Sequence, residues 1–120
     1  MTSQGHPRAE FQRAVDRGNL LQAKALAKVI AHNAGKVSLG DALSLLYLMA
    51  TKHDDAFERA ALRWVVRFVS EVPAVTIEEA QLALAGLATL DRLPKDGSAQ
   101  EALAALCRRH AIIPPRAVNA

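Results

Sequence analysis

The sequence predicts an all-α fold of about six short helices arranged as antiparallel hairpins. Half of the 120 residues are apolar but only 4% are aromatic, and Ala and Leu supply 24 and 16 positions, which suits closely packed helices. Signals for helix starts recur at regular distances along the chain. In addition, no segment alternates convincingly between apolar and polar residues with the period of two that a half-buried strand requires.

The start signal is a short oxygen-bearing side chain followed three positions later by a residue that can bond back to it. It occurs at Asn19–Gln22, Ser38–Asp41, Asp55–Glu58, Thr76–Glu79 and Ser98–Glu101. Helix ends are marked by glycines that can adopt a left-handed conformation and by prolines, namely Gly18, Gly35, Pro73, Pro94 and Pro114. Together these signals predict helices over 7–17, 20–34, 39–53, 56–72, 77–92 and 99–110. Residues 1–6 and 111–120 are expected to be flexible ends of a single domain, 1–120.

The outer helices are amphipathic in this pattern. The helix over 7–17 is expected to bury Phe11, Ala14 and Val15. The helix over 20–34 carries a basic stripe opposite an apolar side that contains Leu26, Val29 and Ile30. This basic stripe consists of Lys24, Lys28 and His32. The helix over 99–110 is expected to bury Leu103, Leu106 and Cys107.

The helix over 39–53 is apolar on almost every side, with Ser44 as the only polar residue between positions 42 and 50, so we expect it at the centre. The helix over 56–72 is nearly as apolar and includes Phe57, Trp64, Phe68, Val69 and Val72. Its exception is a charged stripe with the spacing i, i+4, i+8, formed by Arg59, Arg63 and Arg67. The inward side of the helix over 77–92 is predicted to contain Ile77, Ala80, Leu84 and Leu87.

The starts of alternate helices lie 36 to 43 residues apart, and the segments 38–42 and 76–80 match in kind. A helical-hairpin repeat of this length resembles the α-solenoid class, in the manner of HEAT or tetratricopeptide proteins. The fold is therefore expected to be either a compact helical bundle or a short solenoid. An open solenoid would leave an apolar flank exposed and would imply a partner or self-association.

The chain lacks the motifs of common enzymes and metal sites, since it has no glycine-rich phosphate loop, Gly-x-Ser-x-Gly elbow or His-Glu-x-x-His pair. Cys107 and His110 share one helix at i and i+3, but zinc sites usually need three or four ligands and no other histidine has matching spacing. Cys107 is better explained as a small core residue. The charged segment 52–55 is expected to end one helix and cap the next through Asp54 and Asp55. We therefore predict no catalytic residue, cofactor or metal.

The chain is expected to be cytoplasmic. Its single cysteine excludes an intrachain disulfide, and the first ten residues contain no apolar segment of the kind found in secretory signals. The longest uncharged apolar run, 42–51, is much shorter than the roughly 20 residues that span a bilayer. No membrane partner is predicted.

These observations favour a non-enzymatic protein-interaction or scaffold module, whose partner is another protein or a second copy of the chain. Arginine is enriched at interfaces, so the two basic stripes are the best contact candidates. They comprise Arg59, Arg63, Arg67, Lys24, Lys28 and His32.

The alternative is an accessory nucleic-acid-binding protein that contacts phosphates non-specifically through basic helix faces. The net charge is +3, and residues 1–36 carry six basic and two acidic groups, giving +4. A helix-turn-helix around Gly35 fails, because its second helix would present aliphatic side chains to the bases. Phosphate contact would require the basic stripes to adjoin in space, and it would involve Arg13, Arg17, Lys24, Lys28, Arg59, Arg63 and Arg67.

Overall fold

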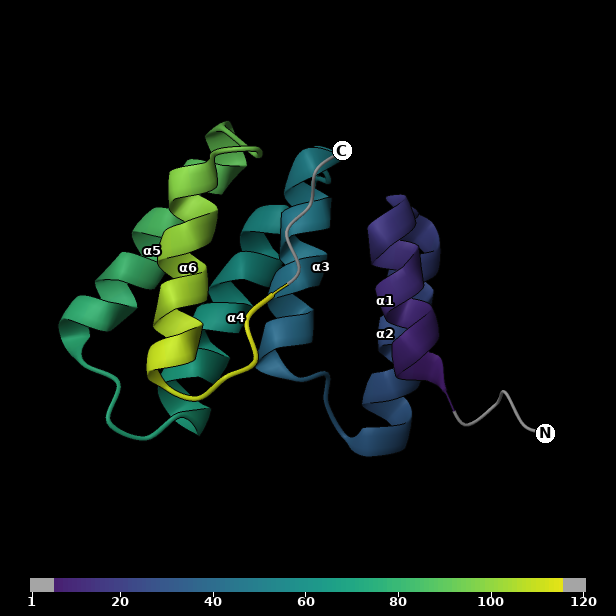
Figure 1. Ribbon diagram of the computed structural model, residues 1–120, viewed down its shortest axis with the longest axis horizontal. Coiled ribbons are helices and arrows are strands. Elements are labelled where there is room, and N and C mark those ends of the chain that lie inside the picture. Colours follow the sequence, from purple (N-terminus) through teal and green to yellow (C-terminus); the bar gives the residue numbers. More distant parts are fainter. Residues whose placement is uncertain (1–5, 116–120) are drawn as a thin grey trace.

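The computed structural model describes residues 6–115, and over this range the chain is an all-α bundle whose successive helices alternate in direction (Figure 1). The helices are α1 (Pro7–Arg17), α2 (Leu20–Ala34), α3 (Leu39–Thr51), α4 (Phe57–Glu71), α5 (Ile77–Arg92) and α6 (Gly97–Arg109). The predicted fold class is confirmed, and each predicted helix end lies within two residues of the observed one. Between residues 6 and 115 no helix combines the length and the apolar character needed to cross a bilayer.

Three of the predicted N-caps are confirmed. The side chains of Asn19 and Ser38 accept hydrogen bonds from the backbone N–H groups of Gln22 and Asp41, at 3.1 and 3.2 Å. Thr76 and Glu79 form a reciprocal capping box, in which each side chain accepts from the other residue's N–H at 3.0 Å. These bonds satisfy N–H groups that have no partner within their own helix, and they fix where α2, α3 and α5 begin.

The other two predicted caps are wrong. Helix α6 begins before Ser98, because the Asp96 carboxylate accepts from the Ala99 N–H at 2.8 Å. Helix α4 has no side-chain cap, and the preceding turn is held by Asp54, which accepts from the Ala56 N–H at 2.8 Å. Aspartate is among the best cap residues, so at α6 an aspartate earlier in the chain takes the role predicted for Ser98.

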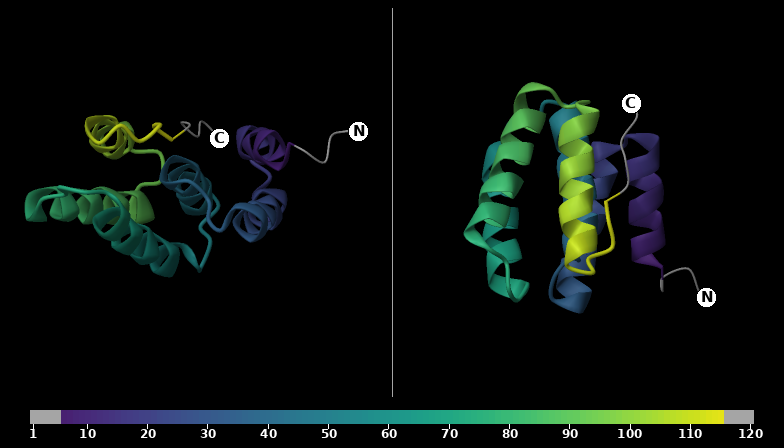
Figure 2. Two further views of the ribbon diagram at one scale, coloured as in Figure 1. Left: turned by 90° about the horizontal axis from the view of Figure 1, so that it is seen from below. Right: turned by 60° about the vertical axis from the view of Figure 1, so that its left-hand side comes forward.

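Helix α3 lies at the centre, as predicted, and packs against α1, α2, α4 and α5. Side-chain hydrogen bonds connect it to α4 and α6 as well as to α1. The Trp64 Nε1–H of α4 donates to the Leu39 carbonyl at 2.9 Å, and the Tyr47 hydroxyl donates to the Gln100 carbonyl at 3.1 Å. Seen along the helices, α2 and α4 flank one side of α3, while α6, α1 and the C-terminal segment lie toward its other side (Figure 2).

The apolar sides of α5 and α4 are partly misassigned by the sequence pattern. Leu87 is buried as predicted, but Ile77 is 81% exposed and Leu84 42% exposed. On α4, Val69 is 45% exposed. The side of α5 that packs inward is defined instead by Ala83, Gly86, Leu87 and Leu90, because α5 contacts α6 closely through Gly86.

The segment 111–115, expected to belong to a flexible end, returns along the bundle. The Ile112 N–H donates to the Cys107 carbonyl at 2.9 Å, and the Ile112 side chain packs against the core. The Ile113 carbonyl approaches α3 so closely that a Cβ atom at Gly40 would lie 2.0 Å from its oxygen. The remainder of the two predicted ends, residues 1–5 and 116–120, lies outside the described residues.

Candidate interaction groove

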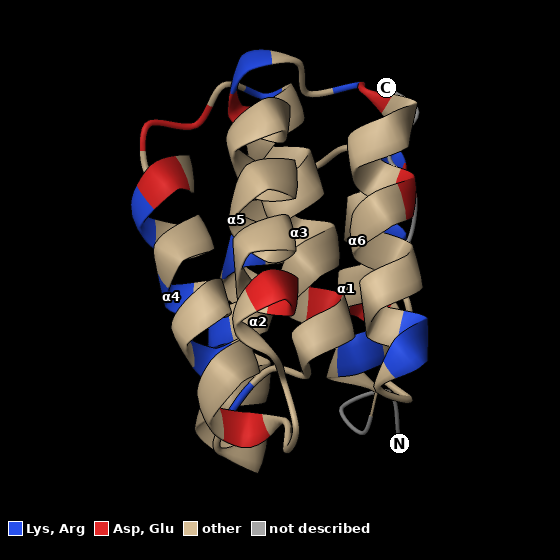
Figure 3. Ribbon diagram, turned by 90° about the vertical axis from the view of Figure 1, so that its left-hand side faces the viewer, with Lys and Arg blue, Asp and Glu red and all other residues tan. Residues whose placement is uncertain are grey.

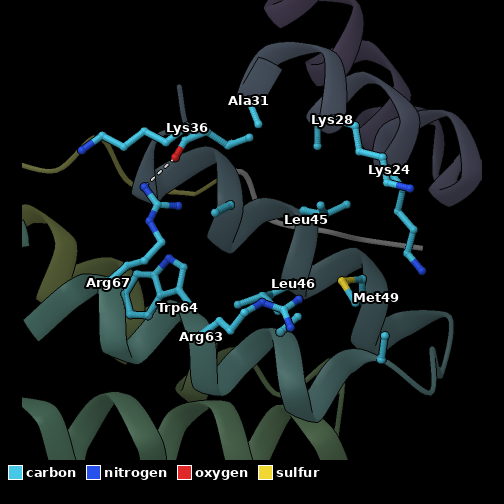
Figure 4. A pocket seen from close by; sticks show the side chains of 15 residues that line it. Lys24, Lys28, Ala31, Lys36, Leu45, Leu46, Met49, Arg63, Trp64 and Arg67 are labelled. Atoms are coloured by element: carbon cyan, nitrogen blue, oxygen red, sulfur yellow. Dashed lines mark hydrogen bonds between the residues drawn. The ribbon is translucent and has the colours of Figure 1, made fainter. Parts of the chain in front are cut away.

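A groove of about 580 Å³ lies between α2 and α4, with α3 as its floor (Figure 4). Its apolar floor carries the spacing i, i+3, i+4, i+7 and consists of Ala42, Leu45, Leu46 and Met49. Small side chains on the two flanking helices contribute to the walls, including Ala27, Ala31 and Ala60. Because α3 is apolar on nearly every side, the side that its neighbours leave uncovered is apolar too. We call this feature the α2–α4 groove.

Basic residues surround the α2–α4 groove. Lys24 and Lys28 line it from α2, Lys36 from the α2–α3 turn, and Arg63 and Arg67 from α4. Two members of each predicted basic stripe therefore face each other across an apolar floor. Basic segments recur along α4 in Figure 3, whereas α5 is uncharged over most of its length.

Carboxylates partner three of these five cations. Lys24 forms an ion pair with Asp54. Glu71 accepts from Lys36 Nζ at 3.2 Å and from Arg67 Nε at 2.9 Å, and Arg67 also donates to the Val37 carbonyl at 2.7 Å. These contacts link α2 and the α2–α3 turn to both ends of α4, and so hold the two walls in position.

These partners favour the ionised form of both carboxylates. The pKa of Asp54 is lowered mainly by its hydrogen bond with Lys24 and then by the Ala56 N–H. The pKa of Glu71 is lowered mainly by its hydrogen bond with Arg67. Lys24, Lys36 and Arg67 therefore contribute to the shape of the groove, with their charge largely compensated.

Lys28 and Arg63 differ from the other three cations. Neither has a hydrogen bond or ion pair within residues 6–115. They come from opposite walls, and Figure 4 shows both beside the groove. The groove thus presents two cations without a carboxylate partner, one on each side of an apolar floor.

The structure separates the six predicted contact residues into two groups. Lys24, Lys28, Arg63 and Arg67 line the groove, whereas Arg59 and His32 are exposed outside its lining. Sequence analysis missed Lys36 and the apolar floor. Lys36 lies in a turn, which a helical pattern does not place, and the floor residues carry the same apolar signal as a closed core.

A separate cluster of polar and charged residues lies where α5 begins and α6 ends. The Glu79 carboxylate lies 3.0 Å from both Arg109 Nη1 and His110 Nε2, and its pKa is lowered to about 2, first by the Thr76 N–H. Cys107 is buried, as predicted, and burial raises the pKa of its thiol to about 11. Glu79 thus joins the start of α5 to the end of α6.

Chemically, the α2–α4 groove offers apolar contact area and two free cations. Over residues 6–115 no buried side-chain nitrogen or oxygen lacks a hydrogen-bond partner, and no three His, Cys, Asp or Glu residues gather as a metal site would require.

Comparison of the chain with models of protein families, with curated proteins and with solved structures gave no match.

Proposed function

We propose that this protein is a non-enzymatic protein-interaction module and that the α2–α4 groove is its contact surface. The observation that carries the proposal is the open apolar floor flanked by the unpaired cations Lys28 and Arg63. Covering apolar surface releases about 25 cal/mol per Å², and arginine is enriched at interfaces. We assign direct contact to Lys28 and Arg63, and a shape-keeping role to Lys24, Lys36 and Arg67.

The proposal is tested with a variant that fills the groove. Ala31 is half-buried on the α2 wall, so Ala31→Leu adds bulk to the groove while keeping a strong helix former. Arg59→Gln is the matched control, because Arg59 is exposed on α4 outside the groove lining. Tagged wild-type protein and Arg59→Gln should retain the same partner from an extract of the source cells, and Ala31→Leu should lose it.

Denaturant unfolding must first establish that Ala31→Leu folds as stably as the wild type. If the folded variant retains every partner, or if the wild-type protein retains none, the proposal fails. Ala60→Leu on the α4 wall repeats the test from the opposite side of the groove.

Accessory nucleic-acid binding is the second candidate function, and the five basic residues around one groove favour it. Three of these residues already have carboxylate partners, and an apolar floor offers nothing to phosphates. Binding of labelled duplex DNA and RNA is measured by fluorescence anisotropy at several salt concentrations. A steep salt dependence, with a slope of about −0.9 per phosphate on DNA, that weakens in Lys28→Gln/Arg63→Gln would support this candidate. Absence of binding at low salt would reject it.

For its location we propose a reducing compartment such as the cytoplasm. Cys107 is the single cysteine of the chain, and its thiol is buried in the core with a raised pKa. A structural thiol of this kind needs no oxidising environment.

A further inference from the structure

We infer that the occupant of the α2–α4 groove is an acidic amphipathic helix of another protein, which lies along α3 and directs carboxylates toward Lys28 and Arg63. This inference rests on the proposed function and adds the chemistry of the partner. It is carried by the shape of the floor and by the positions of the free charges.

The shape of the floor fits a helix. Its four residues recur at i, i+3, i+4 and i+7 on α3, which spans roughly 10 Å, or two turns. The walls of the groove are helices α2 and α4. A partner helix can therefore insert one row of its side chains between them, as in helix-in-groove recognition. A peptide that binds by strand addition would need an unpaired strand edge, and residues 6–115 contain no strand.

The depth of the floor disfavours flat partners. Leu46 and Met49 line the groove but are only 3% and 4% exposed, so a bilayer surface cannot reach them. A leucine or methionine that projects from a partner helix would contact the half-buried Ala42 and Leu45 of the floor. The groove therefore selects side chains that project from a narrow ridge.

The two cations without a carboxylate partner indicate that the partner surface is negatively charged. Lys28 and Arg63 stand on opposite walls without a carboxylate, whereas Asp54 and Glu71 already partner the other three cations. A helix with glutamates on both sides of its apolar row would place negative charge opposite both free cations. This complementarity favours association and register.

A second copy of the chain fits this description less well. The exposed apolar residues of α4, Leu62 and Val66, share that helix with Arg59 and Arg63, so this face is positively charged like the groove. Helix α5 exposes Leu84 in a stretch without charge. Neither face supplies the two flanking rows of carboxylates.

The test uses three matched synthetic peptides of about 18 residues, or five helical turns. All carry the same leucine row at i, i+3, i+4 and i+7 and lack tryptophan. The flanking positions hold glutamate in the first peptide, glutamine in the second and lysine in the third. Trp64 is the only tryptophan of the chain and lines the groove, so its fluorescence reports occupancy. Amide chemical-shift changes on ¹⁵N-labelled protein locate the peptide.

The glutamate peptide should change Trp64 fluorescence and shift amides of α2, α3 and α4 around the groove. The glutamine peptide should bind roughly 2- to 30-fold more weakly, the range expected for two exposed charge pairs. The lysine peptide should be weaker still. In the full-length variant Lys28→Gln/Arg63→Gln, affinity for the glutamate peptide should fall to that for the glutamine peptide, while Arg59→Gln should match the wild type.

The inference is overturned if the glutamate peptide causes no change, if the lysine peptide binds equally well, or if the shifts map to Leu62 and Val66 instead of the groove. Binding to phosphatidylserine vesicles or duplex DNA in place of the glutamate peptide would overturn it as well. If Ala31→Leu abolishes partner capture while no acidic peptide binds, the identity of the occupant is wrong and the proposed function stands. If Ala31→Leu leaves capture intact, the proposed function itself fails.

Discussion

Gly40 has no Cβ atom, and the carbonyl oxygen of Ile113 occupies part of the space that a Cβ would need. In Gly40→Ala the two atoms would be 2.0 Å apart, so the backbone of the C-terminal segment must move away from α3. We expect a loss of about 1–3 kcal/mol in the free energy of unfolding, the usual cost of overpacking. Urea unfolding measures this loss.

Gly97→Ala is the matched control for Gly40→Ala. A Cβ at Gly97 meets nothing within 4 Å, and alanine is favoured over glycine in helices. This variant should be as stable as the wild type or slightly more stable. Equal losses in the two variants would show that the close approach of Ile113 to α3 is absent in solution.

Glu79 makes stability depend on pH in a known direction. Its pKa falls from 4.5 to about 2 because its carboxylate accepts from the Thr76 N–H and lies against Arg109 and His110. A carboxyl with a lowered pKa in the folded state stabilises it above pH 4.5, and this contribution is lost as pH falls toward 2. Glu79→Gln should therefore be less stable than the wild type at neutral pH, and the difference should shrink between pH 4.5 and 2.

Denaturant unfolding of both proteins across this range provides the measurement. Glu78→Gln is the control, because Glu78 is exposed and makes none of these bonds, and it should reproduce the wild-type pH profile. A difference between Glu79→Gln and the wild type that stays constant down to pH 2 would contradict this assignment.

Among the helices, α6 is the one for which two neighbouring residues, Asp96 and Ser98, could each be the N-cap. The structure makes Asp96 the cap, since its carboxylate accepts from the Ala99 N–H. Asp96→Ala should cost about 0.5–2 kcal/mol, the usual value of an N-cap. Ser98 is exposed inside the helix, so Ser98→Ala should change stability by no more than about 0.5 kcal/mol. Thermal and urea unfolding would reveal the reverse order if Ser98 were the cap in solution.

This helix start also shows what the sequence could and could not predict. The pattern of a cap residue with a polar or acidic residue three positions later located α2, α3 and α5, yet it selected Ser98 because Glu101 follows it. A cap needs only an oxygen that reaches a free N–H, and no acid has to follow. Where two oxygen-bearing side chains stand close together, the sequence locates the helix but not its first residue.

The orientation of α5 was harder to predict for a different reason. Its apolar residues are spread around most of the helix, so the pattern does not single out one inward side. The inward side follows from contact with α6, where a Cβ on Gly86 would lie 3.0 Å from Leu103. A glycine adds nothing to an apolar pattern, but it permits the close approach that turns Ile77 and Leu84 outward.

At the scale of the molecule, the α2–α4 groove depends on the relative placement of helices. The sequence supplied both basic stripes and the all-apolar character of α3. That the stripes face each other depends on α2 and α4 packing on the same side of α3, and a pattern within one helix holds no information on its neighbours. Leu46 and Met49 are as buried as core residues, so burial patterns alone do not distinguish a groove floor from a core.

The integrity of this groove depends on the α1–α2 hairpin. The hairpin has only five buried residues, namely Phe11, Ala14, Val15, Ala23 and Ala27, whereas α3 alone has ten. Beyond its packing on α3, it is connected to the other helices by Arg8–Asp41 and Lys24–Asp54. Cooperative units with little buried apolar surface open at lower free energy than the rest of a protein.

We therefore expect native-state hydrogen exchange to reveal an opening of α1 and α2 together, at lower free energy than the exchange of α3 and α4. Lys24→Gln removes the ion pair with Asp54 and should lower the opening free energy of α1 and α2 by at most about 1 kcal/mol, because Lys24 is partly exposed. Amides of α5 and α6 should exchange as in the wild type, since the ion pair that is removed joins α2 to Asp54 and involves neither helix. Uniform exchange across all six helices would mean that the bundle opens as one unit, and that the α2 wall is no more mobile than the α4 wall.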